Sequence, residues 1–246
     1  MLTKTEGATI PLAAMTAALG LYQRLELPLP FRPAKSDIPL LVYGGSSAVG
    51  AFAIKLARQS NIHPIIAIAG KASEFVEKLI DRSKGDTIVD YRKGDEAVVE
   101  GIKQALGGNK LLHAYDATAE GSTGMNISKV LEKNGIVTAV LPTVKVADGV
   151  DLRQTMVGSV HQPEPSPTGG AFKERALGDA EFGSIFFPLF TRGLAHGWFT
   201  AHPHEVVPGG LEGVETALQN LEAGKASAVK YVLRIADSKD AGQDKI

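Results

Sequence analysis

The stretch Tyr43-Gly44-Gly45-Ser46-Ser47-Ala48-Val49-Gly50 decides the fold of this chain when it is read together with its flanks. Residues 39–42 before it are apolar, and residues 51–59 after it favour a helix. A strand, a turn of small residues and a helix in this order form the entry to a dinucleotide-binding βαβ unit, in which the start of the helix binds a pyrophosphate. The usual turn is Gly-x-Gly-x-x-Gly. Here Ser47 replaces the middle glycine, and the turn taken alone fits an ordinary loop equally well.

The second apolar run, residues 63–69, predicts the next strand and indicates which cofactor the site prefers. An NAD site places an Asp or Glu at the end of this strand to bind the ribose 2′-hydroxyl. Neither residue occurs between Ala51 and Ser73, and the strand runs into Gly70-Lys71-Ala72-Ser73 instead. A lysine and a serine suit a 2′-phosphate by charge and by hydrogen bonding. The sequence therefore favours NADPH over NADH, with a solvated Lys71 at a helix start as the alternative.

The composition is typical of a folded protein with a core. Of the 246 residues, 44% are hydrophobic and 22% are charged, which allows one large domain or two small ones. The net charge of −1 predicts no nucleic acid and no acidic membrane surface as partners. No apolar run approaches the length of about 20 residues that crosses a bilayer. The apolar stretch 10–21 reads as a buried helix rather than a signal peptide.

Cysteine and histidine usage limits the chemistry. The chain has no cysteine, which excludes disulfides, thiolate nucleophiles and zinc sites with cysteine ligands, and which fits a cytoplasmic protein. Of the six histidines, only His202 and His204 lie close together in the sequence. We expect them to be two solvated loop residues, with a metal site as the less favoured alternative, and we predict no metal.

Strands and helices alternate along most of the chain, which predicts a doubly wound, six-stranded parallel sheet of the α/β (Rossmann) class. The expected strands cover residues 40–43, 64–69, 87–90, 111–115 and 136–141, with a sixth at 155–160. The expected helices cover residues 9–25, 48–59, 72–81, 95–106 and 122–132. A further helix at 211–222 and a strand at 229–235 follow near the C-terminus.

Two segments between these elements have a different composition. Residues 162–183 contain three prolines within a polar stretch and predict a long surface loop. Residues 184–194 are apolar and aromatic, with Phe186, Phe187 and Phe190. We expect a buried core helix there, with a contact in a homodimer as the alternative.

Several segments together resemble one known family. They are residues 11–20, the turn Gly44 to Gly50, Gly70-Lys71, Asp90-Tyr91-Arg92, Asp116, residues 135–142, and residues 213–235 with Glu222-Ala223-Gly224-Lys225. They resemble the medium-chain dehydrogenase/reductase superfamily, in the zinc-independent quinone/enoyl reductase branch, and fungal reductases of that branch especially. The absence of cysteine also argues against the zinc-dependent alcohol dehydrogenase branch.

The resemblance implies roles for particular residues in NADPH binding. Gly45, Ser46, Ser47, Ala48, Val49 and Gly50 would form the pyrophosphate turn. Lys71 and Ser73 would meet the 2′-phosphate, and Tyr91 would pack near the adenosine end. Val140 and Leu141 would lie beside the nicotinamide ribose. Asp116 is as well explained by capping the following turn as by a cofactor contact. Tyr91 as a surface aromatic, and Val140 and Leu141 as strand core, are the corresponding alternatives.

The chain departs from the family in one respect. Its members carry an N-terminal barrel-like domain that supplies much of the substrate pocket, and this sequence starts at the junction with that domain. We therefore expect residues 1–30 to form a junction helix and residues 31–200 the dinucleotide-binding domain. Residues 201–236 would be a helix-strand remnant of the catalytic domain, and residues 237–246 a disordered tail. The strand 229–235 should expose an edge.

The expected function is that of an NADPH-dependent oxidoreductase of the quinone/enoyl reductase type, which transfers hydride to a quinone or an activated double bond. In this chain we expect mainly its cofactor-binding half, and no catalytic residue is assigned. A non-catalytic NADPH-binding sensor or scaffold protein is the alternative, because the substrate domain is missing. A third hypothesis is an empty site, in which the side chain of Ser47 crowds the pyrophosphate.

Overall fold

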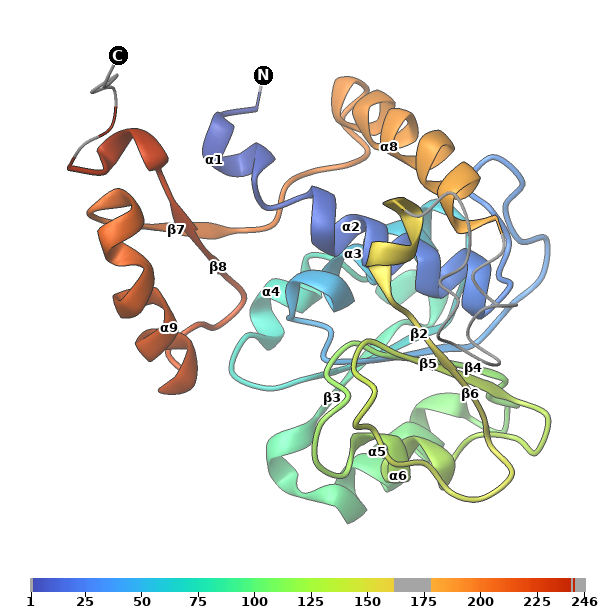
Figure 1. Ribbon diagram of the computed structural model, residues 1–246. Coiled ribbons are helices and arrows are strands. Elements are labelled where there is room, and N and C mark those ends of the chain that lie inside the picture. Colours follow the sequence, from blue (N-terminus) through green and yellow to red (C-terminus); the bar gives the residue numbers. More distant parts are fainter. Residues whose placement is uncertain (1, 162–177, 240, 242–246) are drawn as a thin grey trace.

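The computed structural model describes residues 2–161, 178–239 and 241 of the chain. Its main sheet has six parallel strands in the order β3-β2-β1-β4-β5-β6 (Figure 1). The strands are β1 Leu40–Tyr43, β2 Ile65–Ala69, β3 Thr87–Asp90, β4 His113–Asp116, β5 Ile136–Ala139 and β6 Asp151–Gln154. The strand order reverses between β1 and β4, which is where ligands bind in open parallel sheets.

Helices cover both faces of this sheet because its central strands are apolar on both sides. Alternate residues of β1 face opposite cores: Leu40 and Val42 pack into one, Leu41 and Tyr43 into the other. The first core is covered by α2 Pro11–Ala18, α3 Ala48–Gln59, α4 Ser73–Glu77 and α8 Asp179–Ala195. The second is covered by α5 Asp95–Leu106 and α6 Thr123–Ser128 (Figure 1). The predicted doubly wound α/β fold is confirmed.

Four elements, β1, α3, β3 and α5, begin and end at the predicted residues. Three helices are shorter than expected: α4, α6 and the helix at 214–222 near the C-terminus. The predicted first helix changes at Leu19 into a π-helix, η1 Leu19–Arg24, in which a Cβ at Gly20 would overlap the ring of Tyr115.

The sixth strand is at a different position from the one predicted. It is β6, Asp151–Gln154, whereas residues 155–160 lead into the 3-10 helix η4 Val157–His161. An edge strand has one neighbour and keeps its side chains partly exposed, so β6 has a polar sequence that apolar patterning does not reveal.

The predicted loop at residues 162–183 is also wrong at its C-terminal end, because Asp179 to Gly183 form the first turns of α8. The rest of that prediction, residues 162–177, lies outside the described residues. The interpretation of residues 184–194 as a core helix is confirmed, since Phe186 and Phe190 are buried and Phe190 stacks on Phe199 with ring centroids 5.0 Å apart.

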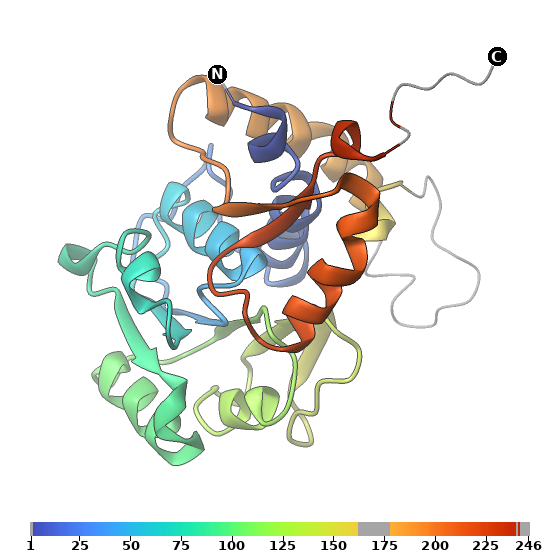
Figure 2. The ribbon, with the colours of Figure 1, turned by 90° about the vertical axis from the view of Figure 1, so that its left-hand side faces the viewer.

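The C-terminal part forms a second, two-stranded sheet of β7 His204–Val207 and β8 Lys230–Leu233. The helix α9 Val214–Glu222 joins them after a 3-10 turn, η5 Gly210–Gly213. Figures 1 and 2 show this unit at one side of the molecule, next to the short N-terminal helix α1 Lys4–Gly7. One edge of β8 is paired in parallel with β7. In the predicted tail, residues 240 and 242–246 lie outside the described part.

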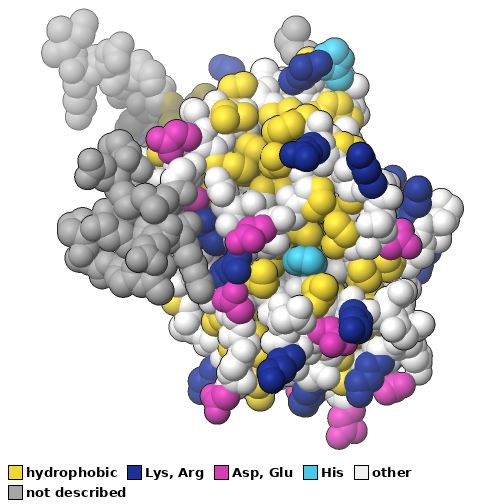
Figure 3. All heavy atoms as spheres, turned by 90° about the vertical axis from the view of Figure 1, so that its right-hand side faces the viewer, with side chains coloured by type: hydrophobic (Ala, Val, Ile, Leu, Met, Phe, Trp, Pro, Cys, Tyr) yellow, Lys and Arg dark blue, Asp and Glu magenta, His cyan; other side chains and the backbone are white. Residues whose placement is uncertain are grey.

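Three further 3-10 turns complete the described elements: η2 Arg82–Lys84, η3 Tyr91–Lys93 and η6 Ile235–Asp237. None of the helices in the described ranges is both long and apolar enough to cross a membrane. On the face shown in Figure 3, side chains of both charge signs are interspersed with clusters of hydrophobic side chains.

His202 is buried, so the expectation that it is solvated is wrong, and His204 is half-buried. The ring of His202 meets Phe75 edge-on at a centroid distance of 5.4 Å, and its backbone N–H donates to Thr9 Oγ1. Burial, with the nearby charges of Lys55 and Lys230, lowers the pKa of His202 to about 4. Within the described residues, no three metal-ligating side chains come together.

We expect the free energy of unfolding to fall as the pH is lowered from 6.5 toward 4. The unfolded chain takes up a proton on His202 near its ordinary pKa of 6.5, whereas the folded chain resists protonation down to about 4. Urea unfolding at several pH values in this window measures the effect. His202→Gln should lose much of the pH dependence, and the same substitution at the exposed His196 should keep it. The same slope in His202→Gln and the parent would contradict this assignment.

Candidate functional site

The turn before α3 is closed tightly against the sheet. Gly44 has a left-handed φ of 79°, and its N–H and that of Gly45 both donate to the carbonyl of Ile68, at 3.1 and 2.8 Å. A Cβ at Gly50 would overlap the carbonyl oxygen of Gly44, so only glycine fits there. The turn thereby places the start of α3 at the carboxyl end of β1.

Ser47 is the N-cap of α3 and directs its side chain back into the helix. Its Oγ accepts from the backbone N–H of Gly50 at 3.0 Å. The backbone N–H groups of Ala48 and Val49, in the first turn, have no acceptor within a helix of this geometry. The start of α3 therefore offers N–H donors and a partial positive charge to an anion.

Two hollows meet at this helix end, and Ser47 and Ala48 line both of them. The larger has a volume of about 760 Å³ and lies beside Tyr43, Ser46 and Lys71. The smaller has a volume of about 470 Å³ and a mainly apolar lining that includes Leu12, Val140, Leu141 and Met156. Together they form one elongated groove with the N-terminus of α3 at its middle.

Lys71 and Tyr91 both line the larger hollow. The ring of Tyr91 lies over Gly70, where an added Cβ would come within 2.6 Å of its Cε1 atom, and half of Tyr91 remains exposed. Lys71 is exposed. Ser73 begins α4, donates its N–H to the Gly70 carbonyl, and is not among the residues that line either hollow.

Two carboxylates that sequence reasoning missed also line the larger hollow, Asp95 and Glu120. Asp95 Oδ1 accepts from Ser122 Oγ at 2.7 Å and Asn126 Nδ2 at 2.8 Å, and these bonds lower the pKa of Asp95. The second strand ends without an acidic residue, but the hollow beside it still contains a carboxylate, because α5 supplies Asp95 from another part of the sequence. Lys71 provides the positive charge at this end.

Asp116 is fully buried and caps the loop after β4. Its Oδ1 accepts from the N–H groups of Thr118 and Ala119, at 3.1 and 2.7 Å, and its Oδ2 accepts from Thr123 Oγ1 at 2.6 Å. Burial raises the pKa of Asp116. This arrangement favours the capping interpretation over a cofactor contact, and it makes Asp116 a support for the loop that lines the larger hollow.

The C-terminal unit contributes to both hollows, which sequence reasoning did not anticipate. Gly224 and residues 226–229 line the larger one, and Lys230 lines the smaller one. Lys230 is the one charged side chain among the residues that line the smaller hollow, and burial lowers its pKa. The Glu222-Ala223-Gly224-Lys225 turn marked this region in the sequence, but nothing in the sequence indicated that it reaches the groove.

Comparison with known proteins identifies relatives. No family model matches the chain. It is 46% identical over 217 residues to the trans-enoyl reductase fsr4 of Gibberella fujikuroi, a match that covers 86% of this chain and 60% of the relative. It is 28% identical over 247 residues to the trans-enoyl reductase thnE of Trichoderma harzianum, covering 94% and 64%.

Solved structures share the fold. The CurK enoyl reductase superposes with a TM-score of 0.69 at 18% identity, over 94% of this chain and 64% of that chain. The chain belongs to the medium-chain dehydrogenase/reductase superfamily. A further structure with this fold, CurA of Vibrio vulnificus in complex with NADPH, has a TM-score of 0.58 at 16% identity, covering 89% and 61%. This superfamily member spans less than two thirds of the length of fsr4 and thnE.

Replacing Asp116 by Asn should lower the free energy of unfolding by about 1–3 kcal/mol, because the amide offers three buried donors only one acceptor oxygen, and that oxygen carries no charge. Urea denaturation measures this loss. Thr123→Val, which removes only one of the three donors, should cost less. If Asp116 acts as a cap, NADPH affinity of the folded Asn variant should stay within about threefold of the parent. A much larger loss would support the cofactor-contact interpretation instead.

Proposed function

We propose that this chain binds NADPH along the groove and forms the cofactor-binding part of a reductase that acts on an activated carbon–carbon double bond. The observation that carries the proposal is the order of features along the groove. A lysine and an aromatic ring line one hollow, the N-terminus of α3 lies where the two hollows meet, and the other hollow is mainly apolar. This order matches that of a 2′-phosphate with adenosine, a diphosphate and a nicotinamide.

The turn suits a diphosphate. The close approach of Gly50 to Gly44 leaves backbone rather than side chains at the helix end, and Ser46, Ala48 and Val49 line the groove there. Ser47 Oγ is held by the N–H of Gly50, so its hydroxyl caps the helix. This orientation argues against the hypothesis that Ser47 crowds the pyrophosphate.

The adenosine end supports a preference for NADPH through Lys71 and Tyr91. The ammonium group of Lys71 can pair with a 2′-phosphate, and the exposed half of Tyr91 offers a ring on which an adenosine can pack. The CurA structure, which has the same fold, was determined with NADPH bound. Contact of Ser73 with the 2′-phosphate is less well supported, because Ser73 does not line the hollow.

The apolar hollow suits the reacting end. Val140 and Leu141, with Leu12 and Met156, form an apolar surface on which a nicotinamide can pack. NADPH, when bound, supplies a hydride, and a proton from the protein or solvent completes the reduction of the double bond to a single bond. The chain itself orients the ring. The fungal relatives are named trans-enoyl reductases, which favours an enoyl substrate over a quinone.

Lys71→Ala should weaken NADPH binding about tenfold or more and leave NADH binding nearly unchanged, since a charge-assisted contact contributes roughly 1.5–3 kcal/mol. Lys230→Gln is the matched comparison, because its charge lies in the hollow on the other side of the helix end. It should weaken both cofactors to a similar degree. Calorimetric titration measures all four affinities. Equal losses for NADPH and NADH in Lys71→Ala would remove Lys71 from the 2′-phosphate.

Oxidation of NADPH, followed by its absorbance with enoyl thioesters and quinones as acceptors, tests the activity. We expect turnover with enoyl thioesters by the chain alone or after fusion to the unmatched part of the relative fsr4. NADPH binding without turnover in both samples would support the non-catalytic sensor or scaffold instead. Absence of NADPH binding by a folded chain would rule out both functions.

A further inference from the structure

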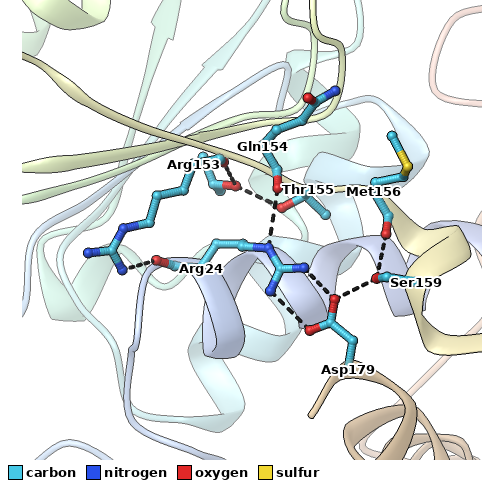
Figure 4. A network of polar contacts seen from close by, with 8 residues as sticks. Arg24, Arg153, Gln154, Thr155, Met156, Ser159 and Asp179 are labelled. Carbon is cyan, nitrogen blue, oxygen red and sulfur yellow. Dashed lines mark hydrogen bonds and ion pairs between the residues drawn. The ribbon is translucent and has the colours of Figure 1, made fainter. Parts of the chain in front are cut away.

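A buried charged pair joins Arg24 at the end of η1 to Asp179 at the start of α8 (Figure 4). Their side chains are 1% and 0% exposed. Arg24 Nη1 donates to Asp179 Oδ1 at 3.0 Å, and Nη2 donates to Oδ2 in a second, shorter bond. The two side chains, 155 positions apart in the sequence, therefore meet in a bidentate pair.

Stability alone does not account for this pair. Removing two charges from water costs about as much as their attraction returns, and apolar side chains of similar volume are often at least as stable. A buried pair of this kind does impose one geometry on the elements that it joins, because each charge needs its partner in place. Its neighbours therefore indicate what it positions.

The neighbours of the pair belong to the wall of the apolar hollow. Arg24 Nε donates to the carbonyl of Gln154 at 3.2 Å. Ser159 Oγ lies within hydrogen-bonding distance of Asp179 Oδ2 and, at 2.7 Å, of the Met156 carbonyl. Gln154 and Met156 both line the hollow. The segment 154–158 thus has the groove on one side and the charged pair on the other.

Further bonds hold the same segment from the sheet (Figure 4). Thr138 Oγ1 of β5 donates to the Arg153 carbonyl and lies 2.7 Å from Thr155 Oγ1. Arg153 Nη1 donates to the carbonyl of Arg24 at 2.7 Å. The wall is therefore linked by polar contacts to η1, β5 and α8, although it follows an edge strand with a single neighbour.

We propose that Arg24 and Asp179 are positioning residues that hold the segment 154–158 in place as the wall of the nicotinamide end. This inference rests on the proposed function, because that function assigns the apolar hollow to the nicotinamide. It predicts that the pair affects how tightly the nicotinamide part of NADPH binds and does not affect binding of the rest of the cofactor. Ser159 transmits part of this effect through Asp179 and Met156.

The test compares two ligands, NADPH and 2′-phospho-ADP-ribose, which lacks the nicotinamide. In the double variant Arg24→Met with Asp179→Leu, neither charge of the pair is left buried without the other, so the chain should fold with a Tm near that of the parent. We expect its Kd for NADPH to rise about tenfold, and its Kd for 2′-phospho-ADP-ribose to change by less than about threefold. Ser159→Ala, a milder change that folds more readily, should shift the two ligands in the same selective way by a smaller factor.

The same double substitution at the exposed pair Arg234 and Asp237, whose side chains are 56% and 38% exposed, is the matched control and should alter neither affinity. If the folded double variant and Ser159→Ala bind both ligands as the parent does, or lose both equally, the positioning role is overturned while the proposed function stands. If the parent itself binds neither ligand, the proposed function fails and this inference fails with it.

Discussion

The close contact between the start of α3 and the end of β1 is the constraint on which the groove depends. Gly50 lies so near the carbonyl of Gly44 that no side chain fits between helix and strand, and Gly44 adopts a left-handed φ of 79° to make the turn. The helix N-terminus therefore lies where the strand order reverses, between β1 and β4. Both hollows meet at that helix end, so any ligand that spans the groove must pass the free N–H groups of the first turn.

The parts of the fold that could be predicted are those whose cause is local. All residues of β1 and β2 are buried, so these strands appear as continuous apolar runs. The helix α5 is followed by Gly107, whose left-handed φ caps the helix, so its C-terminal end could also be predicted from the sequence. The edge strand β6 has no such signature, because its residues are half-exposed and include Asp151 and Arg153. Apolar patterning favoured residues 155–160 instead, which form part of the wall of the smaller hollow and most of η4.

The site could be predicted in part for the same reason. Residues 46–49, Lys71, Tyr91, Val140 and Leu141 follow the carboxyl ends of parallel strands, and all of them line the groove. Asp116 and Asp95 show the limit of such reasoning. Asp116 ends β4 and Asp95 begins α5, yet the first caps the following loop and the second lines the larger hollow, and only packing distinguishes them. Lys230 reaches the groove through the second sheet, whose paired residues are 26 positions apart in the sequence.

The two ends of the groove depend on different physics. At the adenosine end, Lys71 is exposed and its charge is hydrated until a phosphate displaces the water. Salt screens this charge at a distance, so it acts only on a ligand group that binds next to it. At the apolar end few polar groups can select anything, so the shape of the hollow must be fixed from behind. Apolar contacts are non-directional and allow a wall of loop residues to shift, whereas a buried bidentate pair allows one arrangement. Besides Lys230, which lines the apolar hollow, the charges that act on this end in our proposal are the buried ones of Arg24 and Asp179, which hold its wall.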